Sequence, residues 1–271
     1  MDILQAIILG IIEGATEFLP ISSTGHLIVS EKLIGFHDTA EIYTVVVQLG
    51  AILAAVWYFR KDLARIIGGL LARDKSMTAF CKNVLLGLIP AAVLGVIIEK
   101  TVGLPDSLVL IAIMLIVGGA IFIIIENLPH TQPDPGGDVA YGSISSKRSL
   151  LVGLGQCLAL IPGVSRSGAT IMTGLLVGLD RKTATVFSFY LSIPLMIAAS
   201  AIKLLDNSSS ISEISGGSMS LIFGTISAFV SALLVIHWLL GYVQKHDFKP
   251  FAYYRIALGS ILLIMLAFNV I

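Results

Sequence analysis

Two glutamates lie on consecutive helical turns of the first apolar segment, in the sequence Glu13-Gly-Ala-Thr-Glu17. This spacing puts both carboxylates on one face of a helix, and ionisable groups in apolar surroundings are unfavourable unless they face a cavity with partners. Because adjacent acids repel each other, they require a cation, a shared proton, or both. A divalent metal or general-base chemistry would meet this requirement. The alternative is that both acids lie on a solvated face.

A proline and a group of hydroxyls follow directly, in the sequence Pro20-Ile-Ser-Ser-Thr-Gly-His26. Pro20 is expected to end the helix, and Gly25 permits a tight backbone path. The side chains at the start of the next helix are then Ser22, Ser23, Thr24 and His26. Helix N-termini bind anions. An N-cap role explains one of the serines, but it does not explain a histidine beside two glutamates.

A similar cluster occurs in the second half of the chain, in the sequence Pro162-Gly-Val-Ser-Arg-Ser-Gly-Ala-Thr170. An unpaired guanidinium in an apolar segment is very unfavourable, so Arg166 must have a partner. Its planar fork of donors suits a phosphate or diphosphate, and Ser165, Ser167 and local backbone N–H groups would complete an anion cradle. The alternative is an internal ion pair with Glu13 or Glu17, and the two interpretations can coexist.

The composition indicates which elements position these residues. Of 271 residues, 56% are hydrophobic and 13% are charged, whereas soluble domains contain about 25% charged residues. Such a chain has too little polar surface to face water, which predicts an all-α integral membrane protein. The formal net charge is zero, so nothing favours a nucleic acid as partner, and bilayer lipids and lipid-like or small ligands are expected instead.

Six segments are apolar and long enough for transmembrane spans, which need about 20 residues with some tolerance. They are residues 42–59, 84–98, 108–125, 184–204, 221–240 and 251–271. Two further apolar segments, 3–33 and 150–179, are broken by Pro20 and by Pro162-Gly163. Each half is too short to cross alone, so we expect two broken re-entrant helix pairs, with protein or water around each break.

Basic residues in short loops mark the cytoplasmic side. The loop after the first span contains Arg60, Lys61, Arg65, Arg73, Lys75 and Lys82, whereas the loop from Asp206 to Ser218 has no basic residue. The first broken pair is therefore expected to enter from the outside and the second from the cytoplasm.

The chain also resembles itself after a shift of about 143 residues. Gly10, Glu13, Ser22, Thr24 and Gly25 then align with Gly153, Gln156, Ser165, Ser167 and Gly168; Gly87 likewise resembles Gly224, and Gly118-Gly119 resembles Gly259-Ser260. We predict a single membrane domain, residues 1–271, built as an inverted-topology repeat. Repeat one covers 1–126, a cytoplasmic linker 127–147 and repeat two 148–271. Such repeats place binding sites near the membrane midplane. Chance similarity between apolar segments is the alternative.

Other polar residues give weaker signals. Arg255 lies within a span, where single polar residues usually bond a neighbouring helix or extend to the interface. Tyr254 is interpreted as part of an aromatic belt. Gln48 either lines the cavity or bonds another helix.

The motifs E-x-x-x-E, S-S-T-G-H and P-G-V-S-R-S-G-A-T together resemble the bacterial undecaprenyl-diphosphate phosphatase family associated with bacitracin resistance. The resemblance covers nearly the whole chain. It implies a phosphoric anhydride hydrolase that converts undecaprenyl diphosphate to undecaprenyl phosphate, the lipid carrier of peptidoglycan synthesis. It further implies active-site roles for Glu13, Glu17, Ser23, His26 and Arg166, and a requirement for Mg²⁺ or Ca²⁺, with Glu13 and Glu17 as candidate ligands.

A mechanism can be outlined from these residues. The prenyl tail stays among helices or in lipid, while the diphosphate enters a pocket that opens to the periplasmic side of the bacterial cytoplasmic membrane. Its oxygens are expected to contact Ser22, Thr24, Ser165, Arg166 and Ser167. Ser23 is the expected nucleophile, with Glu17 or His26 accepting its proton, and direct attack by His26 stays open. A homodimer is a candidate assembly that the sequence does not decide.

Three other classes of protein are alternatives. A transporter or lipid flippase would share the repeats and broken helices, but the combination of Ser, His, Glu and Arg favours hydrolysis. A type 2 phosphatidate phosphatase needs a second histidine shortly after its Ser-Arg element, and Met172 stands there. A purely structural membrane protein would leave acids and a base at the breaks unexplained.

Overall fold

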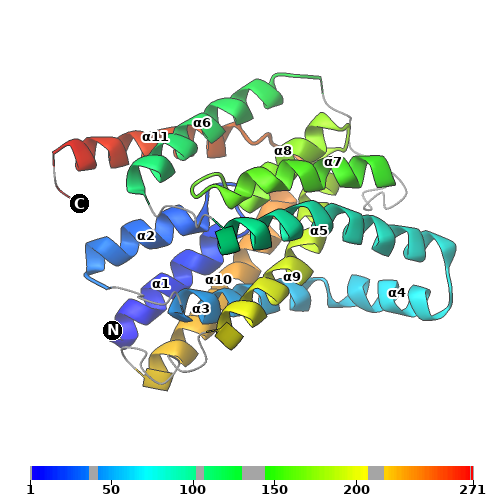
Figure 1. Cartoon of the computed structure of the whole chain (residues 1–271), viewed down its shortest axis with the longest axis horizontal. Coiled ribbons are helices and arrows are strands. Elements are labelled where there is room, and N and C mark those ends of the chain that lie inside the picture. Colours follow the sequence, from blue (N-terminus) through cyan, green and yellow to red (C-terminus); the bar gives the residue numbers. More distant parts are fainter. Residues whose placement is uncertain are drawn as a thin grey trace.

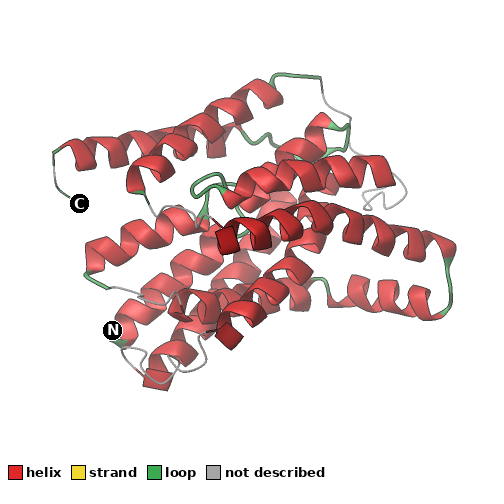
Figure 2. Ribbon diagram, in the orientation of Figure 1, coloured by secondary structure: helices red, strands yellow, loops and turns green. Residues whose placement is uncertain are grey.

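The computed structural model describes residues 2–36, 42–101, 107–129, 144–206, 217–268 and 270, and within these residues it is helical without strands (Figure 2). Its elements are α1 (Ile3–Thr16), α2 (Ser23–Ile34), α3 (Ile42–Tyr58), α4 (Arg60–Leu71), α5 (Lys75–Thr101), α6 (Leu108–Glu126), α7 (Ser146–Gln156), the 3₁₀ turn η2 (Cys157–Leu160), α8 (Arg166–Leu176), α9 (Arg181–Asp206), α10 (Gly217–Tyr242) and α11 (Lys249–Ala267).

Six helices correspond to the six predicted spans. Of these, α5, α6, α9, α10 and α11 are each long and apolar enough to cross a membrane, and α3 together with α4 forms a sixth candidate that bends by 69°. The chain is therefore an all-α, multi-pass membrane protein, as predicted. The bend falls where the apolar run of α3 ends at Tyr58 and the basic sequence beginning at Arg60 follows.

The basic segment after the first span is helical and not a loop. Residues 60–71 form α4, and α5 already begins at Lys75. Charged residues of α4 such as Arg65 are exposed, whereas Ile66 is buried. A search for long apolar runs misses such an amphipathic helix because its apolar residues occupy one face only.

Both broken segments form pairs of short helices whose breaks meet in the middle of the molecule. Figure 1 shows α1 and α2 reaching the centre from one end, where the two termini lie, and α7 and α8 reaching it from the other. Gly163 in the second break has φ +91°, a conformation that favours glycine. The chain thus places two irregular turns deep inside a bundle of long helices, where protein surrounds their backbone.

Close glycine contacts hold the first helix of each pair against a long helix from the other half of the chain. A Cβ atom at Gly10 would collide with the backbone of Gly224 on α10, and one at Gly153 with the backbone of Gly87 on α5. Small residues permit such close packing between membrane helices. Gly10 with Gly153, and Gly87 with Gly224, are the pairs that the repeat hypothesis aligns. The inverted repeat remains a prediction, and this reciprocal packing supports it.

The predicted linker, 127–147, lies largely outside the described residues, and α7 begins at Ser146. The guanidinium of Arg181 forms a two-pronged ion pair with the buried carboxylate of Glu126, with N–O distances of 3.2 and 2.5 Å. The backbone N–H of Phe248 also donates to Glu126, at 3.0 Å. These contacts connect the ends of α6, α9 and α11.

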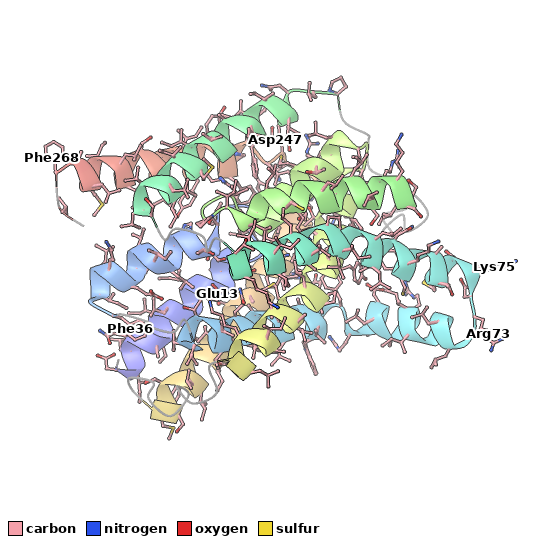
Figure 3. The ribbon with its side chains drawn as sticks, viewed as in Figure 1. Glu13, Phe36, Arg73, Lys75, Asp247 and Phe268 are labelled. Carbon is pink, nitrogen blue, oxygen red and sulfur yellow. The ribbon has the colours of Figure 1, made fainter. Side chains whose placement is uncertain are left out.

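The two ends of the bundle provide a test of membrane orientation. Arg73 and Lys75 lie at the end opposite Phe36 and Phe268, with Glu13 between the ends (Figure 3). In a background lacking Cys81 and Cys157, we expect Lys75→Cys to react with a membrane-impermeant maleimide only from the cytoplasmic side, because basic residues stay in the cytoplasm. Ser210→Cys, in the connection between α9 and α10, should react only from outside. Labelling of both from one side would contradict the predicted topology.

Candidate active site

Each broken pair turns at a serine with an unusual backbone. Ser22 has φ +72° and Ser165 has φ +76°, a region that non-glycine residues enter at a cost of about 1–3 kcal/mol. Both serines cap the helix that follows, because Ser22 Oγ accepts from the backbone N–H of Gly25 at 3.4 Å and Ser165 Oγ from that of Gly168 at 3.2 Å. Such strain tends to be retained at functional sites. The helices α2 and α8 therefore begin directly at the two turns. Their N-termini can bind an anion there.

A cavity of about 220 Å³ opens between the two turns, α3 and α9. It is smaller than the pockets of about 300 Å³ or more that enclose drug-sized ligands, so its size suits a polar head group. Its lining consists of Glu17, Ser22, Ser23, Thr24, Gln48, Ala159, Ile161, Pro162, Gly163, Ser165, Arg166, Leu195, Met196 and Ala199. The sequence-predicted residues Glu13, His26 and Ser167 are not part of that lining.

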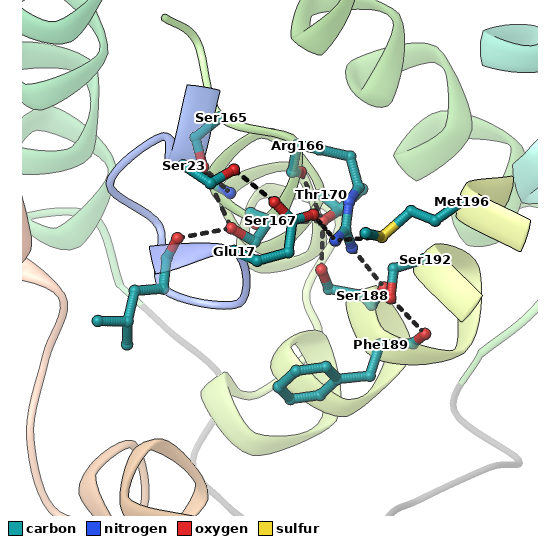
Figure 4. Close-up of polar contacts among 12 residues, drawn as sticks. Glu17, Ser23, Ser165, Arg166, Ser167, Thr170, Ser188, Phe189, Ser192 and Met196 are labelled. Atoms are coloured by element: carbon teal, nitrogen blue, oxygen red, sulfur yellow. Dashed lines mark hydrogen bonds and ion pairs between the residues drawn. The ribbon is translucent and has the colours of Figure 1, made fainter. Parts of the chain in front are cut away.

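Glu17 connects the two turns at this cavity (Figure 4). The Ser23 hydroxyl donates a hydrogen bond to Oε2 of Glu17, and the guanidinium of Arg166 donates to Oε1 at 2.9 Å. The ion pair is largely shielded from solvent, with side-chain exposures of 14% for Arg166 and 7% for Glu17. The Glu17 carboxylate therefore accepts a hydrogen bond from the Ser23 hydroxyl and forms an ion pair with Arg166 at the same time.

Arg166 retains donor capacity beyond this ion pair. Its second terminal nitrogen donates to the Ser188 carbonyl at 3.4 Å, and the nitrogen that contacts Glu17 also approaches the Met196 sulfur at 3.1 Å. Its buried Nε–H has no hydrogen-bond partner among the described residues. The ion pair between Arg166 and Glu17, which the sequence offered as the alternative to anion binding, is present. Arg166 also lines the cavity and keeps an N–H donor that could bind an anion.

Glu13 lies one helical turn before Glu17 and is 1% exposed. Its Oε1 has no hydrogen-bond partner among the described residues. The negative charge of Glu17 repels the Glu13 carboxylate, and the positive charge of Arg166 attracts it. A buried carboxylate with an unpaired oxygen attracts a proton or a cation. Within the described residues, no group of three or more His, Cys, Asp and Glu side chains gathers at one point. A metal here would therefore need oxygens from a ligand or from water as well.

His26 faces α11 and is fixed there at both ring nitrogens. Nδ1 lies 2.7 Å from the Ser22 carbonyl and Nε2 lies 2.7 Å from the Tyr254 hydroxyl, with the two rings stacked. Because a carbonyl only accepts, Nδ1 carries a proton, and in the neutral imidazole Nε2 accepts from the Tyr254 hydroxyl. Of the two residues expected to accept the Ser23 proton, Glu17 and His26, the structure places Glu17 in hydrogen-bond contact with Ser23.

Comparison with known proteins identifies the family of the chain. The family model of "Bacitracin resistance protein BacA" matches residues 6–261. The chain belongs to the BacA family. Undecaprenyl-diphosphatase 1 of Burkholderia lata is 43% identical over 265 residues, which cover 97% of this chain and 95% of the relative. Undecaprenyl-diphosphatase of Acinetobacter baumannii is 41% identical over 271 residues, covering 98% and 97%, and that of Rhizorhabdus wittichii is 41% identical over 267 residues, covering 98% of both chains. The resemblance inferred from the motifs is thus confirmed.

Ser167 joins the two turns of this BacA-family chain directly. Its hydroxyl donates to the Leu19 carbonyl at 2.8 Å and lies 3.1 Å from the Ser165 hydroxyl. With an exposure of 2%, it is placed to hold the second turn against the first. Ser167 is one of the predicted phosphate ligands, and in the structure its hydroxyl contacts the Leu19 carbonyl and the Ser165 hydroxyl.

Arg255 is a residue of the BacA-family fold whose importance the sequence did not indicate. It is fully buried, and its guanidinium donates to the carbonyls of Pro20 at 3.2 Å, Gly163 at 3.1 Å and Val164 at 2.9 Å. Further bonds reach the backbone of α6, and the group lies 5.1 Å from the centre of the Phe122 ring. Both turns are therefore attached to one side chain of α11. The only signal in the sequence is an arginine inside an apolar span.

Proposed function

We propose that this chain hydrolyses undecaprenyl diphosphate to undecaprenyl phosphate and phosphate, and thereby recycles the lipid carrier of peptidoglycan synthesis and gives bacitracin resistance. The observation that supports this most strongly is a serine hydroxyl bonded to a carboxylate, beside an arginine with an unpaired N–H, at one cavity. Membership of the BacA family and the names of the relatives support the same activity.

In the proposed reaction, Ser23 Oγ attacks the terminal phosphorus and its proton passes to Glu17 Oε2, with which it already shares a hydrogen bond. The bond between that phosphorus and the bridging oxygen breaks, and polyprenyl phosphate leaves. Water then attacks the phosphoserine, which releases phosphate and returns the proton to Ser23. Arg166 and the capped N-termini of α2 and α8 stabilise the phosphate charge, as phosphoryl transfer requires.

The balance of charge supports a cation as part of this site. Arg166 is the basic residue and Glu17 the acidic residue of the cavity lining, Glu13 adds a buried acid nearby, and a diphosphate adds further negative charge. Mg²⁺ is commonly bound by one or two carboxylates together with substrate phosphates. Glu13, with its unpaired oxygen, and Glu17 would hold Mg²⁺ or Ca²⁺, which would supply charge neutralisation when bound.

The cavity is proposed to open to the periplasmic side of the cytoplasmic membrane. It touches Gln48 in the first half of α3 and Ala199 in the second half of α9. If the basic residues are cytoplasmic, the start of α3 and the end of α9 face outward. Apolar residues of the lining, including Ala159, Ile161 and Leu195, give the prenyl tail a path toward lipid.

The test is an assay of phosphate release by the purified protein in detergent. Undecaprenyl diphosphate and farnesyl diphosphate are supplied with and without a chelator, and we expect release from both, with loss on chelation and recovery on adding Mg²⁺ or Ca²⁺. A protein that releases no phosphate but moves the lipid between leaflets of a vesicle would instead be a flippase, which the broken helices also allow. Full activity in excess chelator would contradict the proposed cation.

Arg166→Lys should lower kcat/KM by about 10- to 100-fold. The substitution keeps the charge, but one ammonium cannot hold Glu17 and also present a planar fork to a phosphate. The measurement is steady-state phosphate release, on protein whose elution profile in detergent matches the wild type. Near-normal turnover would show that Arg166 serves only as a structural partner of Glu17.

A further inference from the structure

Gln48 is a polar side chain of the cavity that does not come from either broken helix pair. It lies on α3, between the buried residues Val47 and Gly50, and it is partly exposed within the cavity lining. Its amide makes no hydrogen bond with any other described residue, whereas Ser23, Glu17 and Arg166 of the same cavity are joined in a chain of hydrogen bonds. A free amide in an apolar helix is unfavourable unless a ligand or water satisfies it.

The chemistry of the cavity indicates what that amide would meet. Glu17 already accepts from Ser23 and Arg166, and Arg166 is the single basic residue of the lining. A diphosphate carries several oxygen acceptors, and Arg166, the N-termini of α2 and α8 and the lining hydroxyls supply donors from the two turns. A glutamine amide adds two N–H donors without adding charge, and it does so from a third direction, since α3 packs beside α9 and is not part of the two turns.

We propose that Gln48 binds the substrate, with its side-chain N–H groups donating to diphosphate oxygens. This inference rests on the proposed function and adds a binding residue outside the two motif regions. The contact is to the head group, so it is shared by diphosphates of every tail length. The apolar part of the lining, on α9 and the second turn, is left to the tail.

The experiment compares two substitutions with a matched control. Gln48→Met keeps the length of the side chain and removes both donors, and Gln48→Glu keeps the shape and adds an acid close to Glu17. Gln244→Met is the control, because Gln244 donates to the Leu240 carbonyl at the end of α10, outside the cavity lining. Each variant is assayed on farnesyl and undecaprenyl diphosphates, and the rise in melting temperature caused by inorganic pyrophosphate is measured in parallel.

We expect Gln48→Met to lower kcat/KM by about 10- to 100-fold, the range for losing a hydrogen bond to a charged group, by the same factor on both substrates and mainly through KM. Gln48→Glu should lose more, because its carboxylate repels the diphosphate. The rise in melting temperature should shrink in both variants and persist in Gln244→Met.

Two results would overturn the inference: wild-type kinetics and an undiminished pyrophosphate effect in Gln48→Met, or a loss confined to the long-tailed substrate, which would indicate a tail contact. Failure of the proposed function looks different, since the wild type itself would then release no phosphate. The pyrophosphate measurement still reports on Gln48 in that case. If Gln48→Met does not fold, Gln48→Leu is the second variant, because it also removes both donors without adding charge.

Discussion

Ser23→Ala is expected to reduce phosphate release by about 10³-fold or more, because it removes the proposed nucleophile. The hydroxyl is the group that donates to Glu17 at the cavity, and alanine preserves the N-terminus of α2 and the cap provided by Ser22. Ser192→Ala is a matched control, since the Ser192 hydroxyl bonds the Phe189 carbonyl within α9. The control should retain wild-type turnover.

His26→Ala separates the two candidate nucleophiles. Because His26 is held between the Ser22 carbonyl and the Tyr254 hydroxyl, its loss should disturb the turn and lower activity without abolishing it. Acid quenching during turnover gives an independent measurement, since phosphohistidine is acid-labile and phosphoserine survives. An acid-labile phosphoenzyme, together with substantial turnover by Ser23→Ala, would make His26 the nucleophile and Ser23 a phosphate ligand.

The sequence predicted the elements of this fold well because membrane burial imposes a strong and simple pattern. Long apolar runs identified α5, α6, α9, α10 and α11, and Pro20 and Pro162-Gly163 located both breaks. A search for long apolar runs does not identify α4, because charged residues interrupt the apolar residues along its sequence. Local composition thus determines where a helix can cross, and it is less informative for an amphipathic helix beside the membrane.

The sequence indicated several residues of the cavity lining and few of the contacts among them. Charged or hydroxylated residues at broken helices indicated Glu17, Ser23 and Arg166, and the structure brings these three together across the two halves of the chain. The orientation of His26 depends on Tyr254, which is distant in sequence. No local pattern reveals such a partner, because the packing of α11 decides it.

Arg255 illustrates the same limit and leads to a second large expected effect. Its guanidinium satisfies the carbonyls of Pro20, Gly163 and Val164, in turns where no regular helix supplies donors. Each buried carbonyl left without a partner costs about 1–3 kcal/mol. Gly118 leaves the space this side chain occupies, because a Cβ atom there would collide with the guanidinium. The two turns therefore depend on one residue for their relative position.

Arg255→Met, which fills similar volume without donors, should lower kcat by about 10²-fold or more while KM changes less, because Glu17, Ser23 and Arg166 remain but lose their alignment.

Arg181→Met is the matched control. It removes another arginine with a buried partner, Glu126, at the far end of α9, and should lower the melting temperature without lowering kcat per folded molecule. Both variants are assayed well below their melting temperatures, and Arg255→Lys, whose single ammonium can reach only some of the carbonyls, should recover part of the activity. If Arg255→Met matches Arg181→Met in both melting temperature and kcat, Arg255 contributes to stability alone and the turns keep their alignment without it.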